Sequence, residues 1–328
     1  TERLAVSVSQ AGAGRTVPGV IDTIGTAYAM LNRQPYLIMV LVALDLVYWL
    51  GPRLSPIAFT ARVAEWLGRA GADPQAQGLL RDLGTQFDNL LMLLSVLIPT
   101  LVFALGVDRL PQLPALTWNV EVPWWLVPPL ALTLAALGVL VGMGYLTMLG
   151  RLVRGHAVIS PELPRAALRN GLAMIGLYLI LIGLFVLVLM PAMITSVLSV
   201  VIGIDALILP IVSLFLFALS LWAFLLTFFV EEAIVLSQAG PLRALYLSYH
   251  LLRSHFWQAV RFIVAVMIIQ TGAPIALSLF TRTPWGVPFA LVSYAYLITG
   301  LGLASMIFYR DRVAVVLAQQ ASRAASSE

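Results

Sequence analysis

Long apolar segments without acidic residues constrain this chain more than any other feature of its sequence. A helix needs about 20 apolar residues to cross the hydrocarbon core of a bilayer. The segments that reach this length are 124–149, 171–201, 206–230, 257–281 and 286–309. With 61% hydrophobic and 10% charged residues, the composition excludes an ordinary water-soluble globule. We therefore predict an all-α fold, a polytopic transmembrane helical bundle.

Two further apolar segments are shorter. Residues 35–51 hold Asp45 near their middle, but Tyr48 and Trp49 are typical of the membrane–water interface, so we predict a sixth span here. Residues 87–106 have an apolar part that is interrupted by Pro99. Such a break is typical of a kinked, re-entrant or interfacial segment, although a span is not excluded.

Arginine positions orient the spans, because short cytoplasmic loops collect positive charge. Three groups fall where they can share one face of the membrane: Arg151 to Arg169, Arg243 with Arg253, and Arg310 to Arg323. The arginine-containing N-terminus joins that face only if an even number of spans lies between residues 34 and 150. We therefore favour six spans with both termini in the cytoplasm. Seven spans, with 87–106 crossing the membrane and the N-terminus outside, is the alternative.

This topology divides the chain into three parts. Residues 1–34 form a cytoplasmic N-terminal segment with an amphipathic helix, 35–310 a single transmembrane domain, and 311–328 a cytoplasmic tail. Within the domain, 52–123 is a long outer loop region of nearly neutral charge, which is too long for the positive-inside rule to constrain. We expect no signal peptide, because no small-residue cleavage pattern follows the first apolar segment.

A short pattern precedes some of the spans: an amphipathic stretch, an arginine and then the membrane helix. The first copy ends at Arg33 and has these residues on one helical face: Ile21, Ile24, Tyr28 and Leu31. The clearest later copy ends at Arg253 and has Leu242, Leu245, Tyr249 and Leu252; a weaker copy covers 160–172. Such stretches lie in the headgroup region with the apolar face toward the hydrocarbon. We interpret them as surface helices that set topology, and lipid sensing is the alternative.

The copy that ends at Arg253 belongs to a longer motif. After an apolar helix that includes Ile234, the motif positions are Gly240, Ala244-Leu245, Ser248, Leu252-Arg253 and Phe256-Trp257. This pattern resembles that of the membrane domain of glycerophosphoryl diester phosphodiesterases and of related bacterial multi-pass membrane protein families. One departure is Ser237, where those families commonly have an acidic residue. The resemblance implies a six-span fold in the cytoplasmic membrane of a bacterium.

Catalysis is not expected from this sequence. The phosphodiesterases of the resembling group carry out catalysis in a separate soluble barrel, whereas the longest polar stretch here, 52–86, is far shorter than the roughly 250 residues of such a barrel. The chain has no cysteine, no lysine and only 3 histidines, which excludes thiolate and lysine chemistry and leaves few metal ligands. We therefore expect no enzymatic activity, no metal and no other cofactor.

The candidate functional residues are polar side chains within the spans or at their ends: Asp45, Glu231, Glu232, Arg253, Arg261 and Gln270. An ionisable group inside a membrane is costly, so Asp45 needs a partner. The expected partners are Arg261, Gln270 and the hydroxyls of Ser293, Tyr294 and Tyr296. A protonated Asp45 satisfied by one of them has a structural role; the alternative is a proton- or ion-coupled step in transport.

The adjacent acids Glu231 and Glu232 lie at the end of a predicted span. They lack the companion arginine of intramembrane proteases that use a Glu-Glu pair, because the corresponding position is Leu236. We expect an interfacial acidic pair that contacts an arginine, and the candidates are Arg151, Arg154 and Arg253.

The leading functional hypothesis is a non-enzymatic accessory or scaffold protein that organises lipid or holds a partner in the membrane. The alternative is a small permease or exporter that uses Asp45 and the spans broken by Pro191, Pro210 and Pro274. A third hypothesis is a membrane module that works beside a separately encoded hydrolase. Membrane lipids and other membrane protein subunits are the expected partners, whereas arginines dispersed at span ends do not form a nucleic-acid site.

Overall fold

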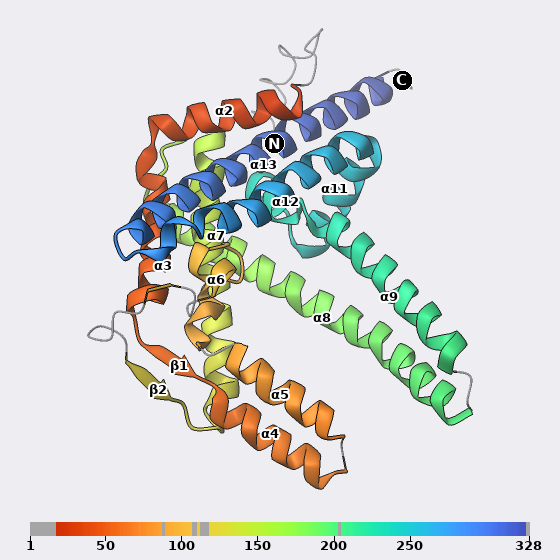
Figure 1. Ribbon diagram of the computed structural model, residues 1–328. Coiled ribbons are helices and arrows are strands. Elements are labelled where there is room, and N and C mark those ends of the chain that lie inside the picture. Colours follow the sequence, from red (N-terminus) through yellow and green to blue (C-terminus); the bar gives the residue numbers. More distant parts are fainter. Residues whose placement is uncertain are drawn as a thin grey trace. The chain divides into compact units, whose positions relative to one another are not determined.

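The structure is a computed structural model, and it describes residues 18–71, 73–86, 89–106, 110–111, 118–202 and 205–325. It is almost entirely helical in these residues, which confirms the all-α prediction (Figure 1). In the described part of the chain, 5 helical segments are long and apolar enough to cross a membrane. They contain α7 (Val127–Val153), α8 (Leu163–Ile202), α9 (Asp205–Thr227), α12 (Phe256–Leu277) and α13 (Gly286–Ala325).

The chain divides into two compact units. Unit 1 contains Thr1–Tyr28, Leu146–Ala265 and Gly302–Glu328, and unit 2 contains Ala29–Tyr145 and Val266–Leu301. The boundary between them falls within the helices α2 (Val20–Arg33), α7, α12 and α13.

The predicted sixth span belongs to unit 2. It consists of a 3-10 turn, η1 (Pro35–Ile38), that continues into α3 (Met39–Leu50). Pro35 starts the turn, where its missing N–H is not needed. The helical segment Pro35–Leu50 is bent by 97° from α2. Together with α2 it is long and apolar enough to form one broken span.

The segment 87–106 is not one continuous helix. Its described residues form a 3-10 helix, η2 (Leu90–Ser95), and a short α6 (Leu101–Leu105), with Pro99 in the break between them. Neither piece is long enough to cross a bilayer. The structure therefore favours the arrangement with six spans over the one with seven.

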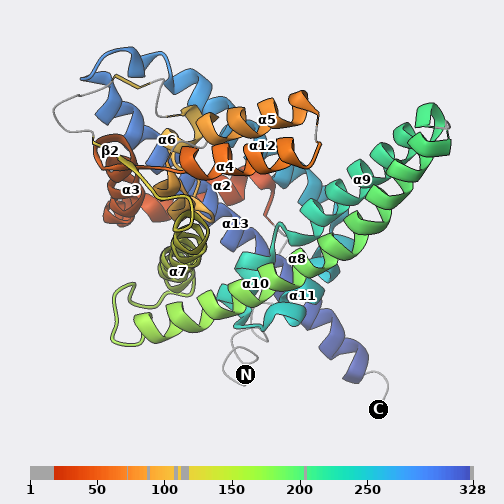
Figure 2. The ribbon, with the colours of Figure 1, turned by 90° about the horizontal axis from the view of Figure 1, so that it is seen from below.

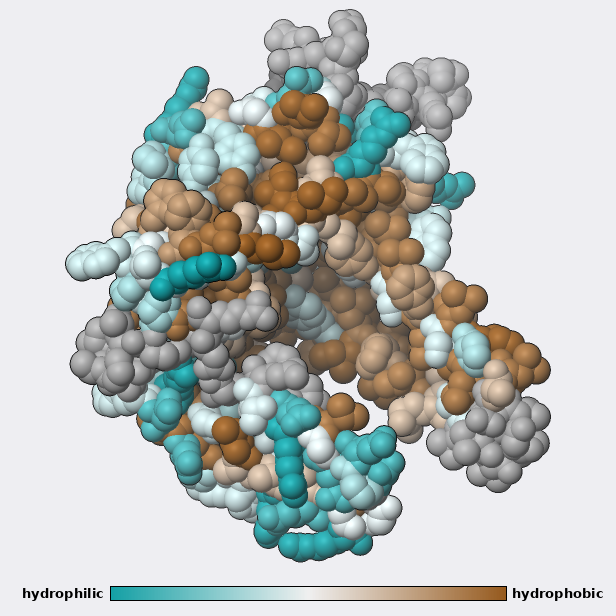
Figure 3. Space-filling model, in the orientation of Figure 1, coloured by the Kyte–Doolittle hydropathy of each residue, from teal (hydrophilic) through white to brown (hydrophobic). Residues whose placement is uncertain are grey.

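The region 52–123, which the sequence predicted to be a loop region, contains ordered secondary structure. Strand β1 (Arg53–Ser55) pairs in parallel with β2 (Asn119–Glu121), with Leu54 opposite Val120. Helices α4 (Ile57–Arg69) and α5 (Pro74–Gln86) pack side by side and have a polar surface (Figures 1 and 3). The side chain of Asn89 accepts the backbone N–H groups of Leu54 and Leu91, both at 3.1 Å, and so joins β1 to η2.

In unit 1, α8 and α9 form an antiparallel hairpin, and the two views show the helices side by side along their length (Figures 1 and 2). Helix α9 is followed by a short α10 (Val230–Ser237) and then by the surface helix α11 (Pro241–Ser254). Pro191, Pro210 and Pro274 lie inside α8, α9 and α12, and each helix continues through its proline, so the predicted breaks are absent from these three helices.

The amphipathic helices α2 and α11 are present, but their buried faces differ from the predicted apolar faces. In α11 the buried residues are Ala244, Ser248, Leu251 and Leu252, and in α2 they include Ala27 and Leu31. The predicted Leu242 and Ile21 are exposed at 68% and 85%. The prediction placed the apolar face toward the hydrocarbon, so the exposure of these two residues does not contradict it. A helix at a membrane surface has two apolar environments, protein and lipid. The weaker copy at 160–172 is not a separate surface helix, because α8 already begins at Leu163.

The C-terminal tail extends the last span. Helix α13 continues to Ala325, so residues 311–325 of the predicted tail are helical. The N-terminal residues 1–17, which contain Arg3 and Arg15 of the predicted basic N-terminus, lie outside the described residues.

Candidate functional site

Asp45 caps another segment of unit 2. Its carboxylate is fully buried and accepts the backbone N–H groups of Leu101 and Val102 at 3.2 and 2.9 Å. These amides open α6, where the first N–H groups of a helix have no partner within the helix. A carboxylate at a helix N-terminus is also attracted by the partial positive charge there. The hydrogen-bond partners of Asp45 are thus backbone amides, and Tyr294, one of the predicted partners, lies close enough to interact electrostatically with the carboxyl group.

Tyr48 lies one turn further along α3. It binds the end of η2, on the other side of the break between η2 and α6. The hydroxyl of Ser95 donates to the Tyr48 oxygen at 2.7 Å, and both residues are buried. Non-helical backbone is tolerated at membrane depth only where protein or water satisfies its polar groups. Asp45 meets that requirement for the amides of Leu101 and Val102, and Tyr48 satisfies the buried hydroxyl of Ser95, so their arrangement is that of a structural cluster.

The helix α7 provides the surface on which this segment packs. A Cβ atom added at Gly138 would lie 2.8 Å from the Cα atom of Leu94, and one added at Gly142 would lie 2.6 Å from the Cβ atom of Leu97. These distances are too short for real contacts, so only glycine fits. Small residues allow such close approach of segments in a membrane protein.

In unit 1, Glu232 of α10 is buried and accepts a hydrogen bond from the hydroxyl of Ser305 in α13. Its second carboxylate oxygen, Oε2, has no hydrogen-bond partner among the described residues. Glu231 is only partly buried. The acids therefore differ in environment: one is held inside unit 1 and its neighbour is partly exposed.

The expected arginine partners of these acids bind elsewhere. Arg154 donates to the backbone carbonyl of Val235 near the end of α10, and Arg151 donates to the carbonyl of Ala157 at 2.8 Å. Among the described residues, no ion pair joins Glu231 or Glu232 to Arg151, Arg154 or Arg253. The predicted contact was therefore wrong. Arg154 binds the end of α10 instead, because the carbonyls at a helix C-terminus attract a cation.

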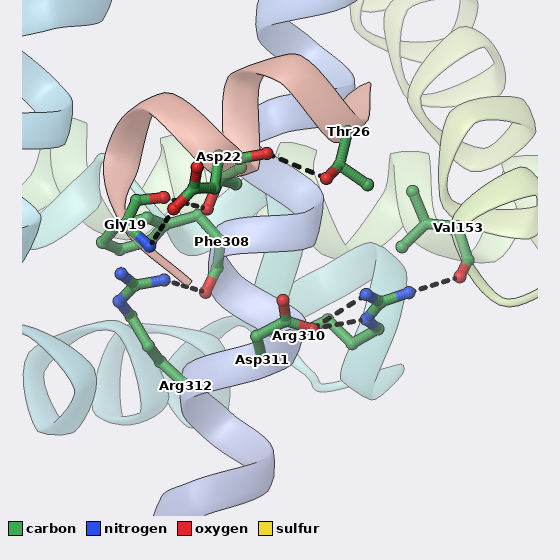
Figure 4. Close-up of polar contacts among 9 residues, drawn as sticks. Gly19, Asp22, Thr26, Val153, Phe308, Arg310, Asp311 and Arg312 are labelled. Carbon is green, nitrogen blue, oxygen red and sulfur yellow. Dashed lines mark hydrogen bonds and ion pairs between the residues drawn. The ribbon is translucent and has the colours of Figure 1, made fainter. Parts of the chain in front are cut away.

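Two arginines of α13 also bind helix carbonyls, and their side chains leave the helix on different sides (Figure 4). Arg310 donates to the carbonyl of Val153, the last residue of α7, at 3.0 Å, and forms an ion pair with Asp311. Arg312 is 1% exposed, and its guanidinium lies 3.4 Å from the ring centroid of Phe308. It donates to the side-chain oxygen of Gln258 at 3.3 Å. Arg154 and Arg310 thus bind carbonyls at helix C-termini, whereas Arg312 is held by Gln258 and Phe308 inside unit 1.

The remaining predicted residues lie on α11 and α12. An open cavity of about 340 Å³ lies at the junction of these helices and is lined by Arg253, Ser254, His255, Phe256, Trp257 and Gln258. The Nε2 atom of His255 is buried without a hydrogen-bond partner among the described residues. Burial and the nearby Arg312 lower the pKa of His255, so its ring is neutral at pH 7. Arg261 is exposed on α12, and Gln270 lies further along the same helix, half-buried.

Sequence reasoning missed several of these residues. Tyr48 was interpreted as an interfacial anchor and Ser305 was not among the candidate residues, whereas both are buried hydrogen-bond partners. The spacing of Asp45 and Tyr48, three residues apart on one helix, was a signal that both side chains share a face. Comparison with known protein families, curated proteins and solved structures gives no significant match to this chain. The resemblance to the phosphodiesterase membrane domain therefore stays a prediction.

Proposed function

We propose that the chain is a non-enzymatic accessory or scaffold protein of a membrane, which organises lipid or holds a membrane protein partner. The α8–α9 hairpin is the observation that carries this proposal. We compared the most apolar 18 residues of each span by the share that is buried inside the protein. This share is 11% in the α8 span and 0% in the span that starts with α9, but 72% in the α13 span. The hairpin surface is apolar where it is visible in Figure 3. Two spans that are not needed to bury the core of unit 1 are free to contact lipid or another subunit.

The composition of the hairpin argues against a solute path along it. No charged residue occurs in 170–204 or 206–230. The hydroxyls of Thr195, Ser196 and Thr227 donate to carbonyls of their own helices, four residues back. A transport path needs polar groups that face a cavity. The proposed permease residue Asp45 is also occupied, since both of its carboxylate oxygens accept backbone N–H groups.

For its location, we propose the cytoplasmic membrane of a bacterium, with both termini in the cytoplasm. The arginines that bind helix ends support this orientation. Arg154 follows α7, and Arg310 lies near the end of the apolar part of α13. Both belong to short positively charged segments, which are retained on the cytoplasmic side.

Photo-crosslinking from the hairpin tests the scaffold proposal. Phe217 of α9 is replaced by benzoylphenylalanine, since it is 67% exposed and lies within a span. Irradiation in native membranes is expected to give a discrete adduct, either with a protein of fixed mass or with a defined lipid class. The matched control is the same replacement at Phe289 of α13, which is 56% exposed. Identical mixtures of lipid adducts at both positions would count against a selective role of the hairpin.

A second candidate function is a proton-coupled permease that uses Glu232. The buried Oε2 atom without a partner favours it, because a carboxyl group that is not fully satisfied can exchange a proton. Under the scaffold proposal, the purified protein in liposomes is expected to give no proton uptake when a pH gradient is imposed. Proton uptake that disappears in Glu232→Gln but persists in Asp45→Asn would contradict the scaffold proposal and support the permease.

A further inference from the structure

The junction of α11 and α12 lies at the depth where lipid headgroups are found. The apolar span that contains α12 begins at Phe256, so the cavity formed by residues 253–258 lies at the first turn of a membrane helix. Phe256 and Trp257 pack edge to face with ring centroids 5.4 Å apart, and Trp257 is 70% exposed. Exposed aromatic pairs of this kind are typical of the level of the headgroups.

The charge at this junction is not compensated within the described part of the chain. Arg253 and Arg261 are both exposed, and neither is in an ion pair with a described residue. Arg312 lies next to the cavity, since it donates to Gln258, which lines it. The first amides of α12 add partial positive charge, whereas the last carbonyls of α11 at the same junction add partial negative charge, so the arginines are the source of the attraction for an anion. The cavity thus has several sources of positive potential and no acidic side chain in its lining.

The apolar span continues from the cavity along α12. Trp257, Arg261 and Val264 are exposed and follow at intervals of four and three residues, which places them on one side of α12. A side chain like that of Arg261 can extend its head toward the interface while its stem lies along apolar surface. A ligand bound here therefore meets cationic groups at one end and membrane-facing apolar side chains at the other.

We propose that the α11–α12 junction binds an anionic phospholipid, with the phosphate in the cavity beside Arg253 and the acyl chains along the exposed face of α12. His255 lines the same cavity, but its Nε2 atom is buried, so the phosphate is held by Arg253 and not by this ring. This inference rests on the proposed role in organising lipid and specifies the lipid class. An acidic peptide would also be attracted by the arginines, but it has no acyl chains to contact the exposed face of α12 within the span.

Binding of phosphatidylglycerol to the purified full chain tests this proposal, with phosphatidylcholine as the neutral reference. Native mass spectrometry of the protein in detergent, titrated with each lipid, measures the two affinities. We expect phosphatidylglycerol to bind more tightly and Arg253→Gln to weaken it about fivefold, the factor expected for one interfacial arginine. Arg261→Gln is a second variant with the same expected direction. The matched control is Arg243→Gln, which removes an exposed arginine of α11 that does not line the cavity.

The outcomes separate the sources of the phosphate. Retention of phosphatidylglycerol in excess inorganic phosphate supports a lipid site, whereas displacement by inorganic phosphate would overturn it in favour of a free-phosphate site. An equal loss in Arg243→Gln and Arg253→Gln would show general surface attraction and would also overturn it. This test is independent of the proposed function: a proton flux lost in Glu232→Gln contradicts the scaffold role and leaves the lipid preference intact. Equal binding of both lipids, with the hairpin adduct still formed, contradicts the lipid site alone.

Discussion

Replacing Asp45 with alanine is expected to lower the free energy of unfolding by about 3 kcal/mol, because two buried amides lose their acceptors. The amides are those of Leu101 and Val102, which the carboxylate accepts at the start of α6. Asp45→Asn keeps one acceptor oxygen and is expected to lose only about 1 kcal/mol, the usual value of a helix cap. Unfolding in mixed micelles, followed by circular dichroism, measures both differences.

The control for Asp45 is Asp22 of α2, an acid that also accepts a backbone N–H near a helix start but is exposed. Its carboxylate accepts the N–H of Gly19 at 3.3 Å (Figure 4). Asp22→Ala is expected to change stability little, because the freed amide remains accessible to water. Hydrogen exchange supplies a local readout, since Asp45→Ala should expose the amides of Leu101 and Val102. Unchanged protection of these amides would show that Asp45 does not hold the segment.

The spans could be predicted from the sequence because their signal is local. A run such as 206–230 has no charge, and every residue of it contributes to the same conclusion. The 35–51 segment was identified in the same way, even though it contains Asp45. The partners of Asp45 could not be found, because they lie 56 and 57 residues along the chain and are backbone groups of a segment that is not regular. No side-chain pattern marks such an acceptor–donor pair.

The other corrections have a similar origin. The strands β1 and β2 are three residues long each and pair across more than sixty residues, so neither has a periodicity that a sequence pattern can detect. The contact of Glu232 with Ser305 links positions 73 residues apart. For α11 the amphipathic pattern correctly predicted a surface helix. It could not distinguish a face that packs on protein, through Ala244 and Ser248, from one that is open to lipid, at Leu242.

Replacing Gly138 with alanine is expected to destabilise the protein by about 3 kcal/mol, at the upper end of the cost of overpacking. The added Cβ atom would meet backbone atoms of η2 itself, including the Leu94 Cα atom at 2.8 Å. Backbone cannot rotate away as a side chain can, so the whole segment must shift from α7. Intrinsic helix propensity acts in the opposite direction, because alanine favours a helix by about 1 kcal/mol over glycine. A net loss of stability therefore reports the contact and not the helix.

A series of three glycines makes this test specific. At Gly142 the added atom would lie 2.6 Å from the Cβ atom of Leu97, which is fixed to the backbone, so Gly142→Ala is also expected to destabilise the protein. At Gly183 in α8 nothing lies within 4 Å, so Gly183→Ala should be neutral or stabilising by up to about 1 kcal/mol. The measurement is the same unfolding titration used for the Asp45 variants. Since Asp45 and Gly138 act on the same segment from two helices, their combined losses should not be additive once the segment has detached. Equal stabilities of Gly138→Ala and Gly183→Ala would mean that the segment does not pack on α7.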